Sequence, residues 1–259
     1  FNLIRIFGAV PYRTEPVLED GPQIHKSRTP VNTIYAGIIS DLQFAAATLG
    51  TEDYGHAGKY TAQSLLVKIY LTRGMWQEAK DLATEIITSG PFSLDPAFEN
   101  LFLNNGQEEI TFAIDFEAVD GNGLSRYYGS KLDGGREEFT PTDELKDLYP
   151  LPDLRYNSTI TSDGLGNKYR DMVGNSDDVF VIRLSDIYLS RVEAELHMET
   201  PDFQQIRNDL NVVRNRAGLN TIYVNSLNSA TQEMMLQRRL EFAFEGQYWF
   251  DLVRTGRAV

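Results

Sequence analysis

Residues 60–94 read YTAQSLLVKIYLTRGMWQEAKDLATEIITSGPFSL. Within this stretch, apolar residues recur at the i, i+3, i+4, i+7 spacing of one helix face, first over 62–70 and again over 76–87. Gly74 separates the two patterns, and Ser89-Gly90-Pro91 ends the second. Two antiparallel helices joined by one glycine turn form a helical hairpin of about 34 residues.

A second hairpin is predicted near the C-terminus. Apolar residues share one helix face over 184–192 and another over 203–217, with Thr200-Pro201 at the start of the second helix and Gly218 just after its end. A last helix is predicted to begin with a capping box, Ser229 with Gln232, and to continue to residue 244. Repeated hairpins of this kind need neighbouring elements to close their core.

Single helices are predicted on the N-terminal side of the first hairpin. Thr29 and Pro30 fit the cap and first position of a helix whose apolar residues run from 34 to 49. The opening residues, FNLIRIFGAVP, fit the last part of an apolar helix that stops at Pro11. We therefore expect the natural polypeptide to extend beyond both ends of this sequence.

The middle of the chain follows no helical pattern. It is rich in glycine, and residues 99–180 hold 17 acidic and 7 basic residues, which is −10 of the net charge of −13. Short apolar runs at 110–116 and 179–184 fit strands, and the rest fits loops. We therefore predict one mainly α domain over 1–259. Helical hairpins at 1–94 and 184–259 form its scaffold, and an irregular, loop-rich region with a few short strands, 95–183, is the part in which a functional site is expected.

Composition excludes several classes of protein. With 259 residues and 42% apolar residues, the chain can form a substantial core. It has no cysteine, which excludes disulfide scaffolds, cysteine nucleophiles and iron–sulfur sites, and its three histidines lie far apart. The negative charge argues against nucleic acid as a partner. No apolar run approaches the roughly 18 residues of a membrane-spanning helix.

Residues 60–94 resemble the tetratricopeptide unit of the SusD/RagB family. Four further segments resemble this family in order and spacing: FNLIRIFGAVP (1–11), RLSDIYLSRVEAEL (183–196), LNVVRNRAGL (210–219) and QRRLEFAFEGQYWFDLVRTG (237–256). The last is the most specific, because its spacings are long and its composition is unusual. The chain departs from the family pattern at Gln237, where Glu is usual, and at Tyr248, where Arg is usual.

The resemblance implies a nutrient-binding lipoprotein on the outer membrane of Bacteroidetes, not an enzyme. Such a protein captures glycans at the cell surface and delivers them to a SusC-like TonB-dependent transporter, with its helical side towards the transporter. It would be held at the membrane by an N-terminal lipidated cysteine, which this sequence does not contain and which we expect in the natural polypeptide. Some members of the family capture peptides, and that alternative stays open. No binding residue belongs to a family-wide motif.

The ligand site is therefore predicted from chemistry. Aromatic rings cover the apolar faces of sugars, and a tyrosine adds a polar tip. Adjacent side chains on a strand point to opposite faces, so Tyr127 and Tyr128 cannot both be buried if they lie on one. The predicted ligand-binding residues, all in the irregular region, are Arg126, Tyr127, Tyr128, Asp133, Arg136, Tyr156 and Tyr169. For any single tyrosine, packing of a loop onto the helices is the competing interpretation.

Two other polar features are interpreted structurally. The oxygen-rich stretches 161–167 and 175–178 could hold a structural calcium ion, but neither has EF-hand spacing, and solvated turns are favoured. No cofactor is expected. Charged residues near the end of the chain, among them the pairs Arg238–Glu241 and Asp251–Arg254, are spaced to meet on a helix. Their aromatic neighbours favour a partly buried ion-pair network over an acid–base site.

Two rival functions remain. A glycoside hydrolase needs two carboxyl groups about 5–5.5 or 6.5–9.5 Å apart, and the chain's 37 acidic residues offer many candidate pairs. An intracellular tetratricopeptide scaffold would show helical repeats from end to end. The glycine-rich middle argues against the scaffold.

Overall fold

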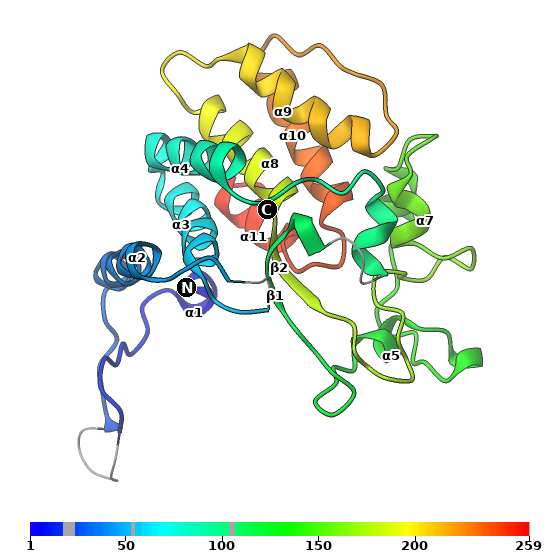
Figure 1. Ribbon diagram of the computed structural model, residues 1–259, viewed down its shortest axis with the longest axis horizontal. Coiled ribbons are helices and arrows are strands. Elements are labelled where there is room, and N and C mark those ends of the chain that lie inside the picture. Colours follow the sequence, from blue (N-terminus) through cyan, green and yellow to red (C-terminus); the bar gives the residue numbers. More distant parts are fainter. Residues whose placement is uncertain (18–23, 53–54, 104–106, 259) are drawn as a thin grey trace.

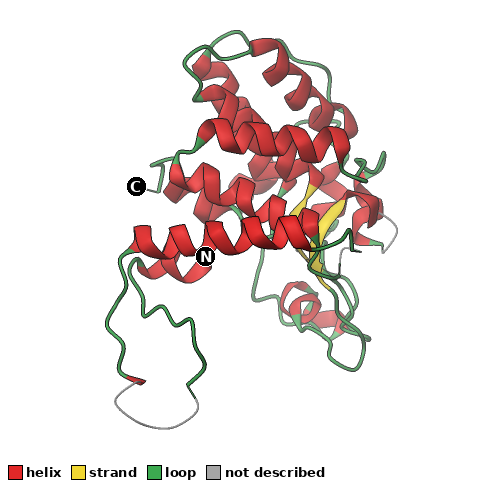
Figure 2. Cartoon of the chain, turned by 60° about the vertical axis from the view of Figure 1, so that its left-hand side comes forward, coloured by secondary structure: helices red, strands yellow, loops and turns green. Residues whose placement is uncertain are grey.

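The computed structural model describes residues 1–17, 24–52, 55–103 and 107–258. The fold of this part is mainly α, as predicted, with one two-stranded sheet (Figures 1 and 2). Its helices are α1 (Asn2–Phe7), α2 (Val31–Thr48), α3 (Lys59–Arg73), α4 (Trp76–Ser89), α5 (Leu124–Tyr128), α6 (Asp143–Asp147), α7 (Arg155–Thr159), α8 (Leu184–Leu196), α9 (Phe203–Arg216), α10 (Leu227–Glu241) and α11 (Tyr248–Arg254). Short 3₁₀ helices are η2 (Phe98–Phe102), η3 (Gln107–Glu109) and η4 (Lys131–Asp133), and the strands are β1 (Ile110–Ile114) and β2 (Val179–Arg183).

Helices α3 and α4 form the predicted hairpin. Gly74 ends α3 in the left-handed conformation, with φ of 69°, which glycine adopts without strain. The adjacent Met75 amide donates to the Tyr70 carbonyl and closes the turn. Small residues on α4, Ala79 and Ala83, are fully buried and let the two helices approach closely.

Helix α8 is the centre of the scaffold. It packs against α3, α4, α9 and α10, so nearly all of its residues are buried. Leu189 and Val192 face the core shared with α9 and α10, and Ile187 faces the α3–α4 hairpin. Figure 1 shows α8 between these two groups of helices. The C-terminal half of the chain thus supplies the neighbours that the first hairpin requires.

Three predicted helix starts are displaced. Helix α10 begins at Leu227 with Ser226 as its cap, because the Ser226 hydroxyl accepts from the Ser229 amide, so the capping box at Ser229 is wrong. Helix α9 is capped by Asp202, whose carboxylate accepts two backbone amides. Helix α2 starts one residue late, since the Thr29 amide pairs with the Val10 carbonyl instead.

The irregular region leaves and re-enters the scaffold through the sheet. Strands β1 and β2 are antiparallel, with Ile114 opposite Val179, so residues 115–178 begin and end at neighbouring positions. Figure 1 shows this segment, with α5 and α7, on the right-hand side of the molecule, beside the helices. Within the described ranges, no helix is long and apolar enough to cross a membrane.

Candidate functional site

Residues 124–139 form a compact loop that doubles back on itself. Helix α5 carries Tyr127 and Tyr128, so the two lie on a helix and not on a strand, and the argument from strand alternation does not apply. The returning segment is bonded to α5: the Arg136 amide donates to the Arg126 carbonyl at 2.7 Å, and the Glu138 amide to the Tyr127 carbonyl at 2.9 Å. These bonds hold the loop's side chains in a fixed arrangement.

Two glycines allow the close packing of this loop. A Cβ on Gly135 would lie 2.2 Å from the Gly129 carbonyl oxygen, so the two backbone segments meet only because no side chain intervenes. A Cβ on Gly166 would lie 2.6 Å from the Tyr128 ring. Gly166 therefore provides the space into which that ring fits.

The outer part of the loop is an exposed aromatic surface. The Tyr127 and Phe139 rings lie 5.5 Å apart between centroids, and Phe139 is 49% exposed. The Arg136 guanidinium lies over the Tyr127 ring, 4.8 Å from its centroid, and its Nε donates to Glu138 at 2.7 Å. We call Tyr127, Phe139, Arg136 and Glu138 the aromatic surface.

The inner part of the loop is a packed aromatic base for this surface, with Tyr128 half-buried. Tyr128 contacts Phe139 at 5.5 Å, stacks on Tyr169 at 5.5 Å, and meets Phe244 edge-on at 5.1 Å. Tyr169 is only 8% exposed, and its hydroxyl donates to the Phe244 carbonyl at 3.4 Å. Burial raises the pKa of both tyrosine hydroxyls. Tyr128 and Tyr169 thus support the aromatic surface from below.

Phe244 connects this aromatic base to the end of α10, and its backbone conformation is unusual. Its φ is 67°, a conformation that bulky residues rarely adopt. Strained residues of this kind persist only where their surroundings hold them. Here the ring is held by Tyr128 and the carbonyl by Tyr169, so the scaffold and the aromatic loop fix each other's position.

The remaining predicted residues divide into two groups. Arg126 and Asp133 are exposed on the same loop, Arg126 on α5 and Asp133 on η4. Tyr156 lies elsewhere, on α7, where its ring meets Tyr149 edge-on at 5.6 Å. Tyr156 and Tyr149 line a separate cavity of about 340 Å³, walled mainly by residues 149–157. The structure therefore places five of the predicted residues on one loop, adds Tyr169 stacked on Tyr128, and leaves Tyr156 elsewhere.

Sequence reasoning missed two aromatic residues of the site, Phe139 and Phe244. Phe139 follows the Tyr127–Tyr128 pair by about ten residues in the same glycine-rich stretch. A search of that stretch for phenylalanine as well as tyrosine would have found it. Phe244 lies more than a hundred residues away in the chain, and its contact with Tyr128 had no local signal.

In each candidate calcium loop, a side-chain oxygen already accepts a hydrogen bond from the backbone. The Thr161 hydroxyl accepts from the Leu165 amide at 2.9 Å within a tight hairpin. The Asp177 carboxylate accepts from the Arg170 and Asp171 amides at 2.8 and 2.7 Å. Across the described ranges, no three His, Asp or Glu side chains gather so that they could hold a metal ion.

The predicted ion-pair network exists, with different partners. Glu241 is fully buried and pairs with three arginines, Arg155 at 3.2 Å, Arg183 at 3.0 Å, and Arg216. The pairing of Arg238 with Glu241 is wrong, because Arg238 turns to Asp186 and Asp251 at 2.8 Å each. The Asp251–Arg254 pair is confirmed at 2.7 Å.

We call the group around Glu241 the Glu241 cluster. It draws together residues from β2, α7, α9, α10 and the loops, and it is electrically balanced. Its cations are Arg155, Lys168, Arg183 and Arg216, and its carboxylates are Glu109, Asp153, Glu241 and Glu245. Burial lowers the pKa of Lys168 to about 8. The cluster lies inside the protein and anchors the irregular region to the scaffold.

The model of the SusD family matches residues 43–258. This match covers most of the chain, and it agrees with the mainly helical scaffold described above. The chain therefore belongs to the SusD family.

Known proteins resemble this chain in sequence and in fold. The SusD-like protein P2 of Formosa agariphila is 26% identical, in an alignment that covers 98% of this chain and 62% of that protein. Surface glycan-binding protein A from Bacteroides uniformis superposes with a TM-score of 0.82 at 22% identity, covering 98% of this chain and 63% of that one. A laminarin-binding SusD-like protein superposes with a TM-score of 0.83 at 24% identity, covering 99% and 68%. The chain thus spans about 62% of the length of its curated relative, and the structural likenesses show a shared fold.

Proposed function

We propose that this chain captures glycans at the cell surface, with the aromatic surface of loop 124–139 as its ligand site. The observation that carries the proposal is the pair of outward rings, Tyr127 and Phe139, on a loop tied down by backbone hydrogen bonds. Membership of the SusD family supports it, as do fold relatives whose names state that they bind glycan or laminarin.

The chemistry of the surface suits a sugar. Two tilted rings offer apolar area to the C–H faces of one or two pyranose units. Arg126 and Asp133 belong to the same loop and have exposed side chains that can pair with hydroxyls. The ion pair between Arg136 and Glu138 keeps the guanidinium on the Tyr127 ring, which leaves a rigid surface. A rigid site loses less conformational entropy when it binds.

The replacement Tyr127→Ala is expected to weaken glycan binding by about 5- to 150-fold, which corresponds to about 1–3 kcal/mol for one stacked ring. Isothermal titration with laminarin oligosaccharides and a panel of other soluble glycans measures this. Tyr223→Ala is the matched control, because Tyr223 also lies beneath an arginine, with Arg207 4.6 Å from its ring, but is more exposed than Tyr127 and lies between α9 and α10. Equal binding by both variants and the unaltered protein would place the site elsewhere.

The proposal extends to delivery. A captured glycan would pass to a SusC-like TonB-dependent transporter facing the helical scaffold, with the chain held at the outer membrane by a lipid anchor. In this proposal, residues 95–183 contact the ligand and the two helical parts contact the transporter. If titration shows binding of peptides and of no glycan, the same surface serves a peptide-capturing member of the family.

We expect binding without hydrolysis. Two carboxylates of the loop are already engaged, Glu138 by Arg136 and Glu137 by the Lys131 amide at 2.8 Å, and in this proposal the rings hold a sugar face and not a glycosidic oxygen. Incubation of the pure protein with a glycan that it binds should release no reducing sugar above the buffer control. Steady release that Glu138→Gln abolishes would instead identify a glycoside hydrolase.

A further inference from the structure

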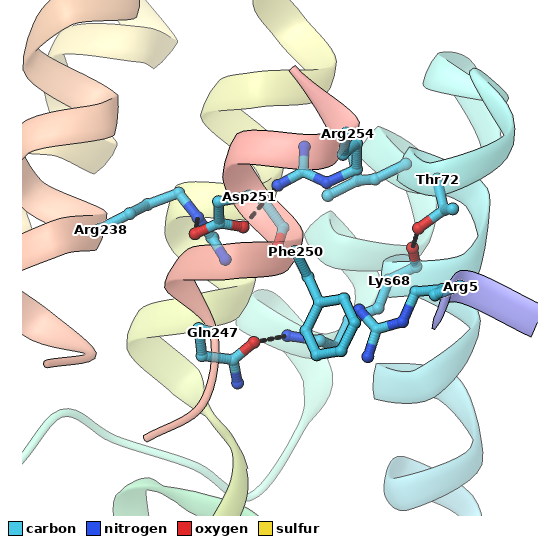
Figure 3. A pocket seen from close by; sticks show the side chains of 10 residues that line it. Arg5, Lys68, Thr72, Arg238, Gln247, Phe250, Asp251 and Arg254 are labelled. Atoms are coloured by element: carbon cyan, nitrogen blue, oxygen red, sulfur yellow. Dashed lines mark hydrogen bonds and ion pairs between the residues drawn. The ribbon is translucent and has the colours of Figure 1, made fainter. Parts of the chain in front are cut away.

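A second buried group of charges lies where α1, α3, α8, α10 and α11 meet (Figure 3). It is separate from the aromatic surface and from the Glu241 cluster. We call it the junction cluster. Its cations are Arg5, Lys68, Arg238 and Arg254, and its carboxylates are Asp186, Glu193 and Asp251.

Most members of the junction cluster are paired. Arg238 bridges Asp186 and Asp251, and Arg254 reaches Asp251 at 2.7 Å and also pairs with Glu193. Lys68 pairs with Asp186 and donates to the Gln247 side-chain carbonyl at 2.9 Å. Every carboxylate of the cluster therefore has a cation.

Arg5 is the cation without a carboxylate partner among the described residues. Its guanidinium lies between two rings, 4.1 Å from the Phe1 centroid and 3.6 Å from that of Phe250, and it donates to the uncharged amide oxygen of Asn2. Its Nε is shielded from solvent and has no protein acceptor in the described part of the chain. Four cations against three carboxylates leave one net positive charge, whereas the Glu241 cluster is balanced.

A small cavity lies among the charged residues of the junction cluster. Its volume is about 20 Å³, enough for one water-sized body. All four cations of the junction cluster line it, together with the hydroxyl-bearing Thr72 and Ser190. The one carboxylate in its wall, Asp251, is engaged through both oxygens by Arg238 and Arg254. Figure 3 shows Arg5 and Lys68 approaching from one side and Arg254 from another.

Arg5 is half-buried, and withdrawing a charge from water without a counter-charge is destabilising, a cost that a counter-ion reduces. We propose that the cavity binds one small monovalent anion, chloride under ordinary conditions, held by Arg5, Lys68 and Arg254. The anion links α1 and α11 to α3, so the site is structural: it fastens the two terminal helices to the hairpin. This site is independent of the glycan proposal.

Bromide tests the site directly. Crystals of the protein grown in sodium bromide should show an anomalous scattering peak inside the cavity, within hydrogen-bonding reach of Arg5, Lys68 or Arg254. The competing way to remove the excess charge is loss of a proton from Lys68, whose pKa is lowered by burial. A cavity that holds only water, or nothing, in the bromide crystals would overturn the proposal in favour of that alternative.

Thermal unfolding tests the site in solution. Sodium chloride should raise Tm saturably over sodium gluconate at the same ionic strength, because gluconate is too large for the cavity. At one hundred times the dissociation constant the rise should be about 5–10 °C. Arg5→Met keeps the packing between the rings and should abolish the difference between the salts.

Arg73→Met is the matched control, since Arg73 is exposed over the Tyr35 ring at 4.9 Å and does not line the cavity. It should retain the difference between the salts. Equal Tm values in the two salts for the unaltered protein would contradict the proposal. If Arg5→Met does not fold, the bromide peak in the unaltered protein decides.

Discussion

Replacing Glu241 by alanine is expected to lower the free energy of unfolding by about 3–5 kcal/mol, or Tm by about 6–20 °C. The carboxylate is fully buried and pairs with Arg155, Arg183 and Arg216, so its removal leaves buried guanidinium charges without a counter-charge. Denaturant unfolding measures the loss. Glu85→Ala is the control: its carboxylate is 48% exposed, lies 3.7 Å from Lys59, and should contribute under about 1 kcal/mol.

The ionisation of Glu241 predicts that the stability of the protein depends on pH. Burial opposes ionisation of Glu241, but Arg216, Arg183 and Arg155 outweigh it and hold the pKa of the folded state well below its usual range. The stability that this carboxylate contributes is therefore fully present at neutral pH and is lost as pH falls below about 4.3, the usual glutamate value. Glu241→Gln should flatten the acid limb of the stability curve. Glycan affinity of the folded fraction should not change, and lost binding with normal stability would contradict this structural role.

The second large effect is expected at Asp186. This residue is 1% exposed and is the shared partner of Lys68 and Arg238, which hold the pKa of its carboxyl well below the usual range against the opposing effect of burial. Asp186→Ala should cost about 3–5 kcal/mol, because both cations lose an anion inside the protein. Thermal unfolding and denaturant titration measure it.

Glu78→Ala is the matched control for this replacement. Asp186 and Glu78 are each the third residue of a helix, α8 and α4, where an acid gains about 0.3–1 kcal/mol from the helix dipole. Glu78 is exposed, so its loss reports the dipole contribution alone. A similar loss of unfolding free energy in the two variants would show that burial and pairing of Asp186 add nothing to stability.

Local patterns were sufficient to predict the long helices of the scaffold and both strands, but not the short helices α5, α6 and α7 of the middle region or the charge clusters. The 3.6-residue spacing gave α3, α4 and α8, and the two apolar runs in the glycine-rich middle became β1 and β2. Such patterns record which face of an element is buried. They say nothing about a partner 118 residues away, which is the separation of Lys68 and Asp186.

The candidate site was predictable to the same degree. Its composition, aromatic residues with arginines in a glycine-rich segment, pointed to residues 120–170 with Tyr127 and Tyr128 first, and whether those residues bind the ligand stays a prediction. How the rings pack depended on tertiary structure: both tyrosines are half-buried, Tyr128 against Tyr169 and Phe244, and Tyr127 against Phe139. Tyr156 was separated from the others because α7 packs next to the end of α10.

The antiparallel pairing of Ile114 with Val179 has a consequence for how such proteins change over time. The segment between these two residues has its two ends one strand spacing apart, roughly 5 Å. The helices therefore need not move when that segment is lengthened or replaced. Doubling the length of a loop with fixed ends costs only about 0.6 kcal/mol. Segment 115–178 can therefore be exchanged without moving the helices, provided the incoming segment again supplies the buried charges of Arg155 and Lys168 that pair with Glu241 and Glu245.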